Sequence, residues 1–490
     1  MPTGDPRTLS VLMPVHNEAR TLRTIVRRVL CSPVDELGLE IQLLAVDDGS
    51  TDNSLAILRE LAEADERITV LGQPRNMGKG TAVRAAIAEA SGDIAIIQDS
   101  DLEYDPAEYP RVLAPILEGR ADAVFGSRFA ASGQRRVLHY WHSQANRWLT
   151  RICNALNDID LTDMETCYKA VRMDVLKQLP LKSTRFGIEP EITTRLAQWN
   201  ARIYEVPISY HARSYAEGKS IGWWDAVKAL ALLVRFRFLD TRFSTHEGYY
   251  LLEGVRRARK YNRWTLDQIE PFIGQRVLEA GCGIGNFTEQ LLTRERLVCA
   301  DDDALFADVT RRRFEHLDSV RVERLDLGTP SSYAILGGES LDTIIAMNVL
   351  EHAQDDAAIV RAFHDLLPPG GRLIVLAPAH PSLASKMDDA LGHVRRYPPD
   401  DLRDLLARGG FEVESARRFN KLGGLGWWVW GRLGRSRLSP KSVRLFDHLI
   451  TIAKLVERVP GLPSLSVIAI GRKPVSAAEA RPGPGATVGA

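Results

Sequence analysis

Two segments of this chain repeat one pattern, in which an apolar strand leads into a turn rich in Gly or Asp. The first segment opens at residues 9–15 and the second at residues 276–280. In the first, Val83, Ile87 and Ala90 share one face of a helix at the 3.6-residue spacing. Strands that alternate with helices form βαβ units around a largely parallel sheet. The sequence therefore predicts two α/β domains, and 490 residues are enough for both.

The strand-like runs and the changes in composition give the domain limits. In the first domain we expect strands at 9–15, 41–46, 68–71, 93–98 and 121–125. In the second we expect strands at 276–280, 297–300, 320–325, 341–347, 372–377, 411–419 and 465–470, and an amphipathic helix at 355–367. We predict a first domain at 1–240, a linker at 241–263, a second domain at 264–473 with a helical insertion at 421–463, and a disordered tail at 474–490.

Charge and cysteine content limit the partners and the compartment. The chain has 63 basic and 63 acidic residues, so no net charge favours nucleic acid as a partner. Residues 1–10 lack the pattern of a secretory signal, and the longest apolar stretch, at 226–238, is interrupted by Lys228 and Arg235. The five cysteines are scattered and form no C-x-x-C pair. We expect a cytoplasmic chain with no membrane-spanning helix and no nucleic-acid partner.

Residues 235–263 interleave eight basic with six aromatic residues. One interpretation is a solvated connector whose aromatic side chains pack on the domains. The other is a patch that rests on a membrane, because cations attract anionic headgroups and aromatic rings favour the interface. The second interpretation would make the chain a peripheral protein at the inner face of a membrane.

Acidic and glycine-rich turns follow strands of the first domain. Asp99 and Asp101 directly follow one strand, and Glu103 lies one alternate position further. Two carboxylates at the carboxyl end of a strand can share a hard cation that neutralises a pyrophosphate. The turn at 47–52 is acidic as well, and Lys79 lies in a glycine-rich turn that opens a helix, where anions bind. A helix cap or a surface lysine explains each feature alone, but three such turns on one sheet edge favour a site for a phosphate-bearing ligand.

These motifs resemble those of the family 2 glycosyltransferases, which have the GT-A fold. They are P-V-H-N-E at 14–18, V-D-D-G-S-T-D at 46–52, G-K-G at 78–80, D-S-D at 99–101 and G-S-R at 126–128. D-M-E-T-C-Y-K at 163–169 and E-G-K-S at 217–220 narrow the resemblance to the dolichyl-phosphate mannosyltransferase and undecaprenyl-phosphate glycosyltransferase branch. The resemblance covers roughly residues 8–235.

The resemblance implies the roles of individual residues. The nucleoside of a nucleotide-sugar donor would be held by Pro14, His16, Glu18, Val46 and Asp48. Mg²⁺ or Mn²⁺ on the diphosphate would be held by Asp99, Asp101 and Glu103. Phosphates would be contacted by Arg128, Arg213 and Lys219, with Lys79 as a further cation. Among these, Asp99, Asp101, Arg128 and Lys219 are the residues we expect to act in catalysis.

The implied acceptor is a polyprenyl phosphate or a similar lipid. Its phosphate is already ionised at neutral pH, so attack on the anomeric carbon needs no general base. The enzyme would instead supply in-line positioning and neutralisation of the leaving group, which are tasks for a metal ion and for Arg and Lys. The family implies inversion at the anomeric carbon. The stretch at 223–243 is a candidate for contact with the membrane.

The second domain carries a different glycine turn, E-A-G-C-G-I-G at 279–285. Its G-x-G-x-G spacing differs from the dinucleotide pattern G-x-G-x-x-G, which disfavours NAD and favours another adenosine ligand. Asp301 ends the next strand, where a carboxylate can bind a ribose diol, and Asp326 ends the third. The fourth strand is followed by N-V-L-E-H at 348–352. This ordered set is more specific than the glycine turn alone.

The set resembles the class I S-adenosylmethionine-dependent methyltransferases, especially the small-molecule branch, over roughly residues 261–473. The resemblance implies a Rossmann-like fold and a cofactor site made by Glu279, Gly281, Gly283, Gly285, Asp301, Asp326 and Asn348. Methyl transfer needs mainly positioning, with a base only where the nucleophile is an alcohol. His352 and His393 are candidate bases, and for each a packing role is equally open.

The leading hypothesis is a bifunctional enzyme, a hexosyltransferase joined to a methyltransferase that acts in the same pathway. The helical insertion either completes the core or forms a lid over a lipid-linked acceptor. One alternative is that a single domain is active and the other is a scaffold. Another is a membrane-docked module that senses nucleotide sugars without turnover.

Overall fold

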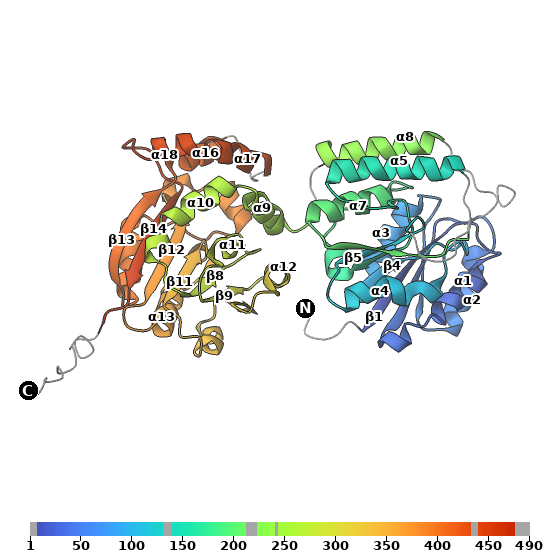
Figure 1. The fold of residues 1–490 in the computed structure, drawn as a ribbon, viewed down its shortest axis with the longest axis horizontal. Helices are drawn as coiled ribbons and strands as arrows, with labels where there is room; N and C mark the ends of the chain where they lie inside the picture. Colours follow the sequence, from blue (N-terminus) through green and yellow to red (C-terminus); the bar gives the residue numbers. More distant parts are fainter. Residues whose placement is uncertain (1–6, 131–139, 212–222, 241–243, 433–439, 476–490) are drawn as a thin grey trace, which may run out of the picture. The chain divides into compact units, whose positions relative to one another are not determined.

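The computed structural model describes residues 7–130, 140–211, 223–240, 244–432 and 440–475. The chain divides into two compact units at His246 and Glu247, and each has one seven-stranded mixed sheet (Figure 1). The prediction of two α/β domains is therefore confirmed. Residues 247–256 and 259–263 of the predicted linker lie in helices of the second unit, and the predicted tail from 476 onward lies outside the described residues.

The first unit contains the strands β1 (Thr8–Val15), β2 (Glu40–Asp47), β3 (Ile68–Gly72), β4 (Ile94–Ile97), β5 (Ala123–Ser127), β6 (Lys169–Arg172) and β7 (Ile203–Pro207). Its α-helices are α1 (Leu22–Leu30), α2 (Ser54–Ala64), α3 (Lys79–Glu89), α4 (Tyr109–Leu117), α5 (Tyr140–Asn157), α6 (Met173–Leu176), α7 (Ile188–Trp199) and α8 (Trp223–Val234). A π-helix, Arg235–Leu239, continues α8. The strand order is β3-β2-β1-β4-β6-β5-β7.

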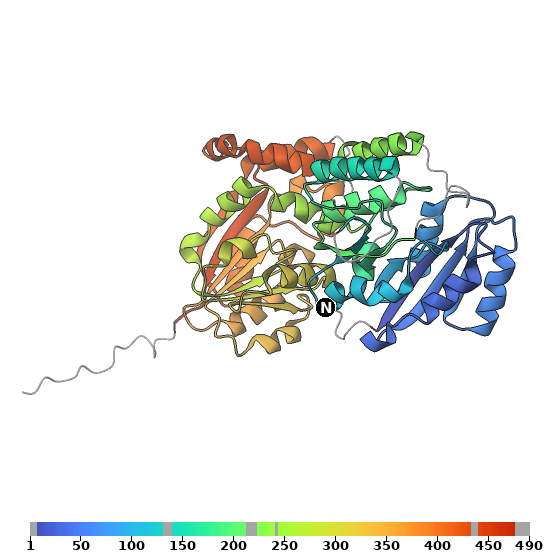
Figure 2. The same ribbon diagram turned by 45° about the vertical axis from the view of Figure 1, so that its right-hand side comes forward.

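β1 lies between β2 and β4, and both pairings are parallel. The carboxyl ends of these three strands therefore meet at one sheet edge, as the predicted site requires. β6 is antiparallel to its neighbours β4 and β5, and the sequence patterns predicted neither β6 nor β7. Helices α5 and α8 lie side by side and pack through Leu149, Cys153, Ala229 and Leu233 (Figures 1 and 2).

The second unit contains the strands β8 (Arg276–Ala280), β9 (Arg296–Asp301), β10 (Val320–Arg324), β11 (Thr343–Met347), β12 (Arg372–Pro378), β13 (Glu412–Phe419) and β14 (Ser466–Arg472). Its α-helices are α9 (Glu247–Arg256), α10 (Arg259–Asp267), α11 (Thr288–Leu291), α12 (Ala304–Phe314), α13 (Asp356–Leu366), α14 (Lys386–Leu391), α15 (Pro399–Arg408), α16 (Lys421–Arg432), α17 (Pro440–His448) and α18 (Ile450–Val456). The strand order is β10-β9-β8-β11-β12-β14-β13.

The predicted insertion consists of α16, α17 and α18, which lie together along one side of this unit (Figure 1). β14 is antiparallel to both β12 and β13, so it is a reversed strand that lies between them, and β13 forms the edge of the sheet. β8 lies between β9 and β11 in parallel, which brings the glycine turn, Asp301 and Asn348 to one edge. Within the described residues, no helix is both long and apolar enough to cross a bilayer.

Candidate active sites

The nucleoside residues predicted for the first unit gather around the ends of β1 and β2. The Nδ1 atom of His16 lies 3.1 Å from the backbone oxygen of Asp48, and the amide of Asn76 lies 2.9 Å from its Nε2. The hydroxyl of Thr21 donates to the carboxylate of Glu18 at 3.0 Å. Pro14 and Val46 are partners in the β1–β2 register. The structure therefore brings together all five residues, and their role in nucleoside binding stays a prediction.

The carboxylate of Asp48 holds the glycine-rich turn in place. It accepts the backbone N–H of Met77 at 2.7 Å and that of Gly78 at 2.8 Å. Gly78 has φ +96°, and a Cβ there would lie 2.4 Å from the backbone oxygen of Thr184. This contact makes glycine necessary, because the turn packs directly on the loop that precedes α7. The N-terminus of α3 is thereby fixed at the sheet edge.

Lys79 is largely buried and lies between two carboxylates. Its ammonium group lies 2.8 Å from Asp99 and 2.8 Å from Glu189. Burial alone would lower the pKa of Lys79, but these carboxylates outweigh it and hold that pKa well above its ordinary value. Lys79 therefore stays cationic at the site. The sequence analysis missed Glu189, because a Glu in the first turn of a helix is common and carries no special pattern.

The three predicted metal ligands follow β4. The N–H of Glu103 donates to Asp101 at 3.1 Å, and the hydroxyl of Tyr210 donates to Glu103 at 2.5 Å. All three ligands offer carboxylate oxygens, which are the donors that Mg²⁺ and Mn²⁺ prefer, so the residues fit such an ion. In the described residues the three carboxylates do not converge within 4.8 Å, and Asp99 forms an ion pair with Lys79 at 2.8 Å. Their role as ligands stays a prediction.

Arg128 forms a buried ion pair with Asp163. Its Nε lies 2.6 Å from one carboxylate oxygen and its Nη2 lies 2.8 Å from the other. Burial alone would raise the pKa of Asp163, but Arg128 outweighs this and lowers it. Lys169, also buried, donates to the backbone oxygen of Met164 at 2.8 Å and so holds the same turn. The predicted phosphate contacts Arg213 and Lys219 lie outside the described residues.

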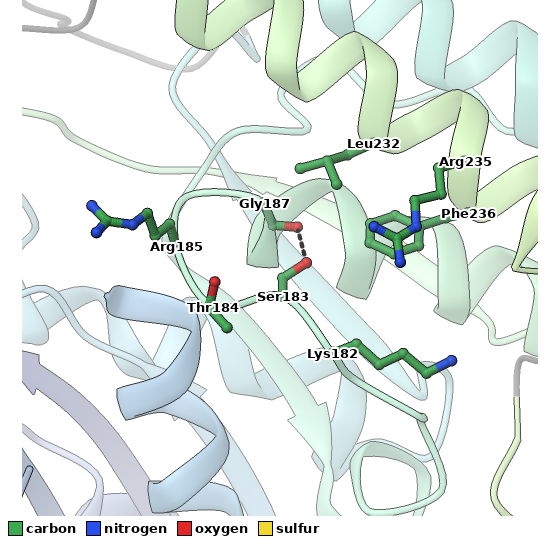
Figure 3. Close-up of a pocket in the computed structure, with 8 residues that line it drawn as sticks. All are labelled: Lys182, Ser183, Thr184, Arg185, Gly187, Leu232, Arg235 and Phe236. Carbon is green, nitrogen blue, oxygen red and sulfur yellow. Dashed lines mark hydrogen bonds between the residues drawn. The ribbon is translucent and has the colours of Figure 1, made fainter. Parts of the chain in front are cut away.

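A pocket of about 200 Å³ lies between the loop that precedes α7 and the end of α8 (Figure 3). Its cationic lining residues are Lys182, Arg185 and Arg235, and Leu232 and Phe236 supply an apolar wall. The loop of this pocket is the one on which the glycine-rich turn packs. The pocket therefore adjoins the predicted donor site.

The three glycines of the turn in the second unit all have positive φ. Gly281, Gly283 and Gly285 have φ of +75°, +55° and +79°. A Cβ on Gly281 would lie 2.4 Å from the side chain of Val349, and one on Gly285 would lie 2.7 Å from Phe314. The turn therefore runs close to its neighbours, which only glycine permits.

Two buried carboxylates flank this turn. Asp301 accepts the N–H of Gly283 at 2.7 Å, and Glu279 accepts the hydroxyl of Thr288 at 2.6 Å. Burial raises the pKa of Asp301 to about 7 and that of Glu279 to about 8. Neither forms an ion pair among the described residues, and their contacts with a ligand stay predictions.

The other predicted cofactor residues lie at the same edge. Asp326 caps its own turn by accepting the N–H of Gly328 at 2.9 Å and the hydroxyl of Thr329 at 2.7 Å. Asn348 has φ +53°, an unusual backbone conformation directly after β11. Their contacts with a cofactor stay predictions.

His352 and His393 lie beside the buried carboxylate of Glu351. Their ring centroids are 5.0 Å apart, and burial raises the pKa of Glu351 to about 8. Burial, together with His393, lowers the pKa of His352. The sequence analysis named both histidines as candidate bases but gave Glu351 no role.

Two protein-family models match separate parts of the chain. Residues 10–180 match the model described as glycosyl transferase family 2, and residues 249–416 match the model described as methyltransferase domain. The chain is a fusion of these two domains. It is an enzyme whose first unit has the GT-A fold and whose second has the Rossmann-like methyltransferase fold, as the sequence predicted.

Solved structures similar to this chain include glucosyl-3-phosphoglycerate synthase from Mycobacterium tuberculosis. Its complex with Mn²⁺, UDP and phosphoglyceric acid is 21% identical, covers 46% of this chain and 78% of its own, and has a TM-score of 0.36. Its complex with Mn²⁺ and UDP-glucose is 20% identical, covers 47% and 79%, and has a TM-score of 0.38. Those ligands are the ligands of that enzyme.

Proposed function

We propose that the glycosyltransferase domain moves a hexose from a nucleotide sugar to a polyprenyl phosphate, and that the methyltransferase domain methylates a product of the same pathway. The observation that carries the first half is a pocket with cations and an apolar wall beside the glycine-rich turn. A lipid phosphate needs both features, because its head is anionic and its tail is apolar.

The donor would bind at the edge formed by β1, β2 and β4. Pro14, His16 and Glu18 would contact the nucleoside, and Asp48 would keep the turn at Lys79 in position. Asp101 and Glu103 are the residues that would hold Mg²⁺ or Mn²⁺, and Asp99 would join them by leaving Lys79. A bound cation supplies neutralisation of the diphosphate leaving group. Lys79 would then contact the diphosphate leaving group in place of Asp99.

The lipid acceptor is supported by the surface of helices α5 and α8. Large apolar side chains are exposed there: Tyr140, Trp141, Trp148, Val227, Val234, Phe238 and Leu239. Exposed cations accompany them at Arg151, Lys228 and Arg235. Aromatic and cationic side chains together favour the interface of an anionic membrane. Peripheral membrane binding by this surface would bring the pocket next to the lipid carrier.

The methyl donor would be S-adenosylmethionine. Gly281, Gly283 and Gly285 leave room for its methionine end, and Asp301 would accept hydrogen bonds from the ribose hydroxyls. Asp326 would lie near the adenine. The cofactor supplies an electrophilic methyl group on a sulfonium, so the protein has mainly to orient the acceptor.

The acceptor is tested in transfer assays with a panel of nucleotide sugars, Mn²⁺ or Mg²⁺, and one of two acceptors. One arm uses polyprenyl phosphate in vesicles that contain anionic phospholipid, and the other uses phosphoglyceric acid in solution. We expect transfer in the vesicle arm, lowered by Arg185→Gln and by Arg235→Gln. Arg28→Gln, an exposed arginine on α1, is the matched control. If sugar is transferred only to phosphoglyceric acid in solution, the acceptor is a soluble phosphate and not a lipid.

The alternative that one domain is only a scaffold predicts a different result. Asp101→Asn should abolish sugar transfer and spare methyl transfer, while Asp301→Asn should do the reverse. If one of these variants changes neither reaction, the domain that carries it is a scaffold. Binding of both ligands without turnover would indicate the sensing module instead.

A further inference from the structure

Three side chains that can bind metal converge beside the end of β11. One ligand atom from each of Glu351, His352 and His393 lies within 4.8 Å of the others. The Nε2 of His393 is 4.0 Å from a carboxylate oxygen of Glu351. Within the part of the chain that the structure describes, this is the one group of three or more such residues at these separations. Small side-chain rotations would bring the three atoms to the distances at which one ion binds them.

The carboxylate of Glu351 is the strongest sign of a missing partner. The side chain is fully buried, and neither of its oxygens has a hydrogen-bond partner among the described residues. Buried polar atoms are seldom left without a partner, and a metal ion bound by these two oxygens would supply one.

The two imidazoles are oriented as metal ligands usually are. The Nδ1 of His352 lies 3.2 Å from the backbone oxygen of Gly392, and the Nδ1 of His393 lies 3.1 Å from the carboxylate of Asp388. Each acceptor requires the imidazole proton to be on Nδ1, so the Nε2 of each ring carries a lone pair that can bind a metal ion. A carboxylate behind a histidine is the arrangement that fixes the tautomer at metal sites.

Asp388 is itself held firmly. Arg396 donates to it from Nε at 2.8 Å, and the N–H of Ser385 donates to its other oxygen at 2.9 Å. These contacts hold the carboxylate where it can accept the Nδ1 proton of His393.

We propose that Glu351, His352 and His393 bind a divalent first-row transition metal ion, with Zn²⁺ as the best match. Two imidazoles and one carboxylate leave a coordination position open, which is typical of sites that bind a substrate oxygen. His352 is exposed, so the site is open to solvent at this residue. The site therefore offers a ligand role for two residues that the sequence analysis considered as bases.

The role of the ion in methylation rests on the proposed function. A hydroxyl of the acceptor would bind in the open position, and the ion would lower its pKa so that the proton passes to solvent. A lone pair of that oxygen would form the bond to the methyl carbon. The carbon–sulfur bond would break with its electron pair left on sulfur, so the sulfonium becomes a neutral thioether.

Metal binding is tested with Co²⁺ as a spectroscopic probe of the full chain after treatment with a chelator. We expect a visible absorption band from a site with nitrogen ligands, because an all-oxygen site at Asp101 would absorb only weakly. His393→Gln and Glu351→Gln should abolish the band, and Asp388→Asn should weaken Co²⁺ binding by about 10- to 100-fold. Asp101→Asn, in the other domain, is the control that keeps the band.

Glu351 is buried, so each variant is also checked by circular dichroism and by binding of S-adenosylmethionine. His352→Gln, at an exposed position, gives a second variant with little risk to folding. A band that survives His352→Gln and His393→Gln in folded protein, or no band in the wild type, would overturn the proposed site. If a variant loses the band but still binds S-adenosylmethionine, the proposed methyltransferase function stands. If the wild type shows the band but does not bind S-adenosylmethionine, the proposed function is refuted and the metal site stands.

Discussion

Replacing Asp301 with Asn should weaken binding of S-adenosylmethionine and leave sugar transfer unchanged. Asp301 is buried at the end of β9 and accepts the N–H of Gly283 at 2.7 Å, so it orders the glycine turn, and in the proposed function it also binds the ribose. A hydrogen bond to a charged group contributes about 1.5–3 kcal/mol. Loss of that charge therefore corresponds to about a 10- to 150-fold increase in Kd.

The assay is isothermal titration calorimetry of the full chain with S-adenosylmethionine. Asp302→Asn is the matched control, because Asp302 is the next residue along and its side chain is exposed. We expect the control to bind like the wild type. An Asp301→Asn variant that is folded and binds within about twofold of the wild type would refute the reasoning from the carboxylate charge.

The same titration has a predicted pH dependence. Burial raises the pKa of Asp301 to about 7, and only the ionised form accepts both hydrogen bonds. Cofactor affinity should therefore fall as the pH drops below 7, by up to about tenfold per pH unit. The pH dependence of affinity that is lost in Asp301→Asn is the contribution of Asp301, and any that remains belongs to other groups such as Glu279. Equal slopes in the two proteins would assign the dependence to another group.

Three further perturbations test the fold around the two sites. Asp163→Asn leaves the buried guanidinium of its partner uncompensated and should lower the free energy of unfolding by about 3–5 kcal/mol in urea titrations; a loss below about 1 kcal/mol would contradict the pairing. Gly49→Ala should destabilise by about 1–2 kcal/mol, because φ is +65° and the new Cβ would lie 2.4 Å from the backbone of Arg75; Gly72→Ala, which meets nothing within 4 Å, is the control. Burial holds the pKa of Glu279 at about 8, so folding favours its neutral form. That stabilisation is fully present below its ordinary pKa of about 4.3 and is lost as the pH rises through 8; the unliganded methyltransferase domain should therefore melt at a lower temperature at high pH.

The strands that position both sites were predictable because their residues are buried on both faces. The run at β4 is four apolar residues, all buried, and its acidic turn follows directly. The glycine turn after β8 was predictable because the spacing of its glycines is visible in the sequence. In the structure each of these glycines has a positive φ. Local pattern and final structure agree where one short segment determines the geometry.

Residues that act across long sequence separations were not predictable in the same way. Lys79 was interpreted as a cation for phosphate, but Glu189, 110 positions later, turns it into part of an ion pair. β6 was not predicted because it has only four residues and pairs antiparallel with its neighbour β4. It therefore lies outside the alternation of strands and helices that indicates the parallel strands. Asp388 gave no signal, since its partner His393 is defined only by the fold of the turn after α14.

The most direct test of the bifunctional account is mass spectrometry of the lipid product. The full chain is incubated with polyprenyl phosphate, a nucleotide sugar and Mn²⁺, with and without S-adenosylmethionine. The account predicts a gain of one hexose in both reactions and a further methyl group only when the methyl donor is present. A hexose gain that never acquires the methyl group would contradict a shared pathway, and no gain with any donor in the presence of bound nucleotide would contradict the lipid acceptor.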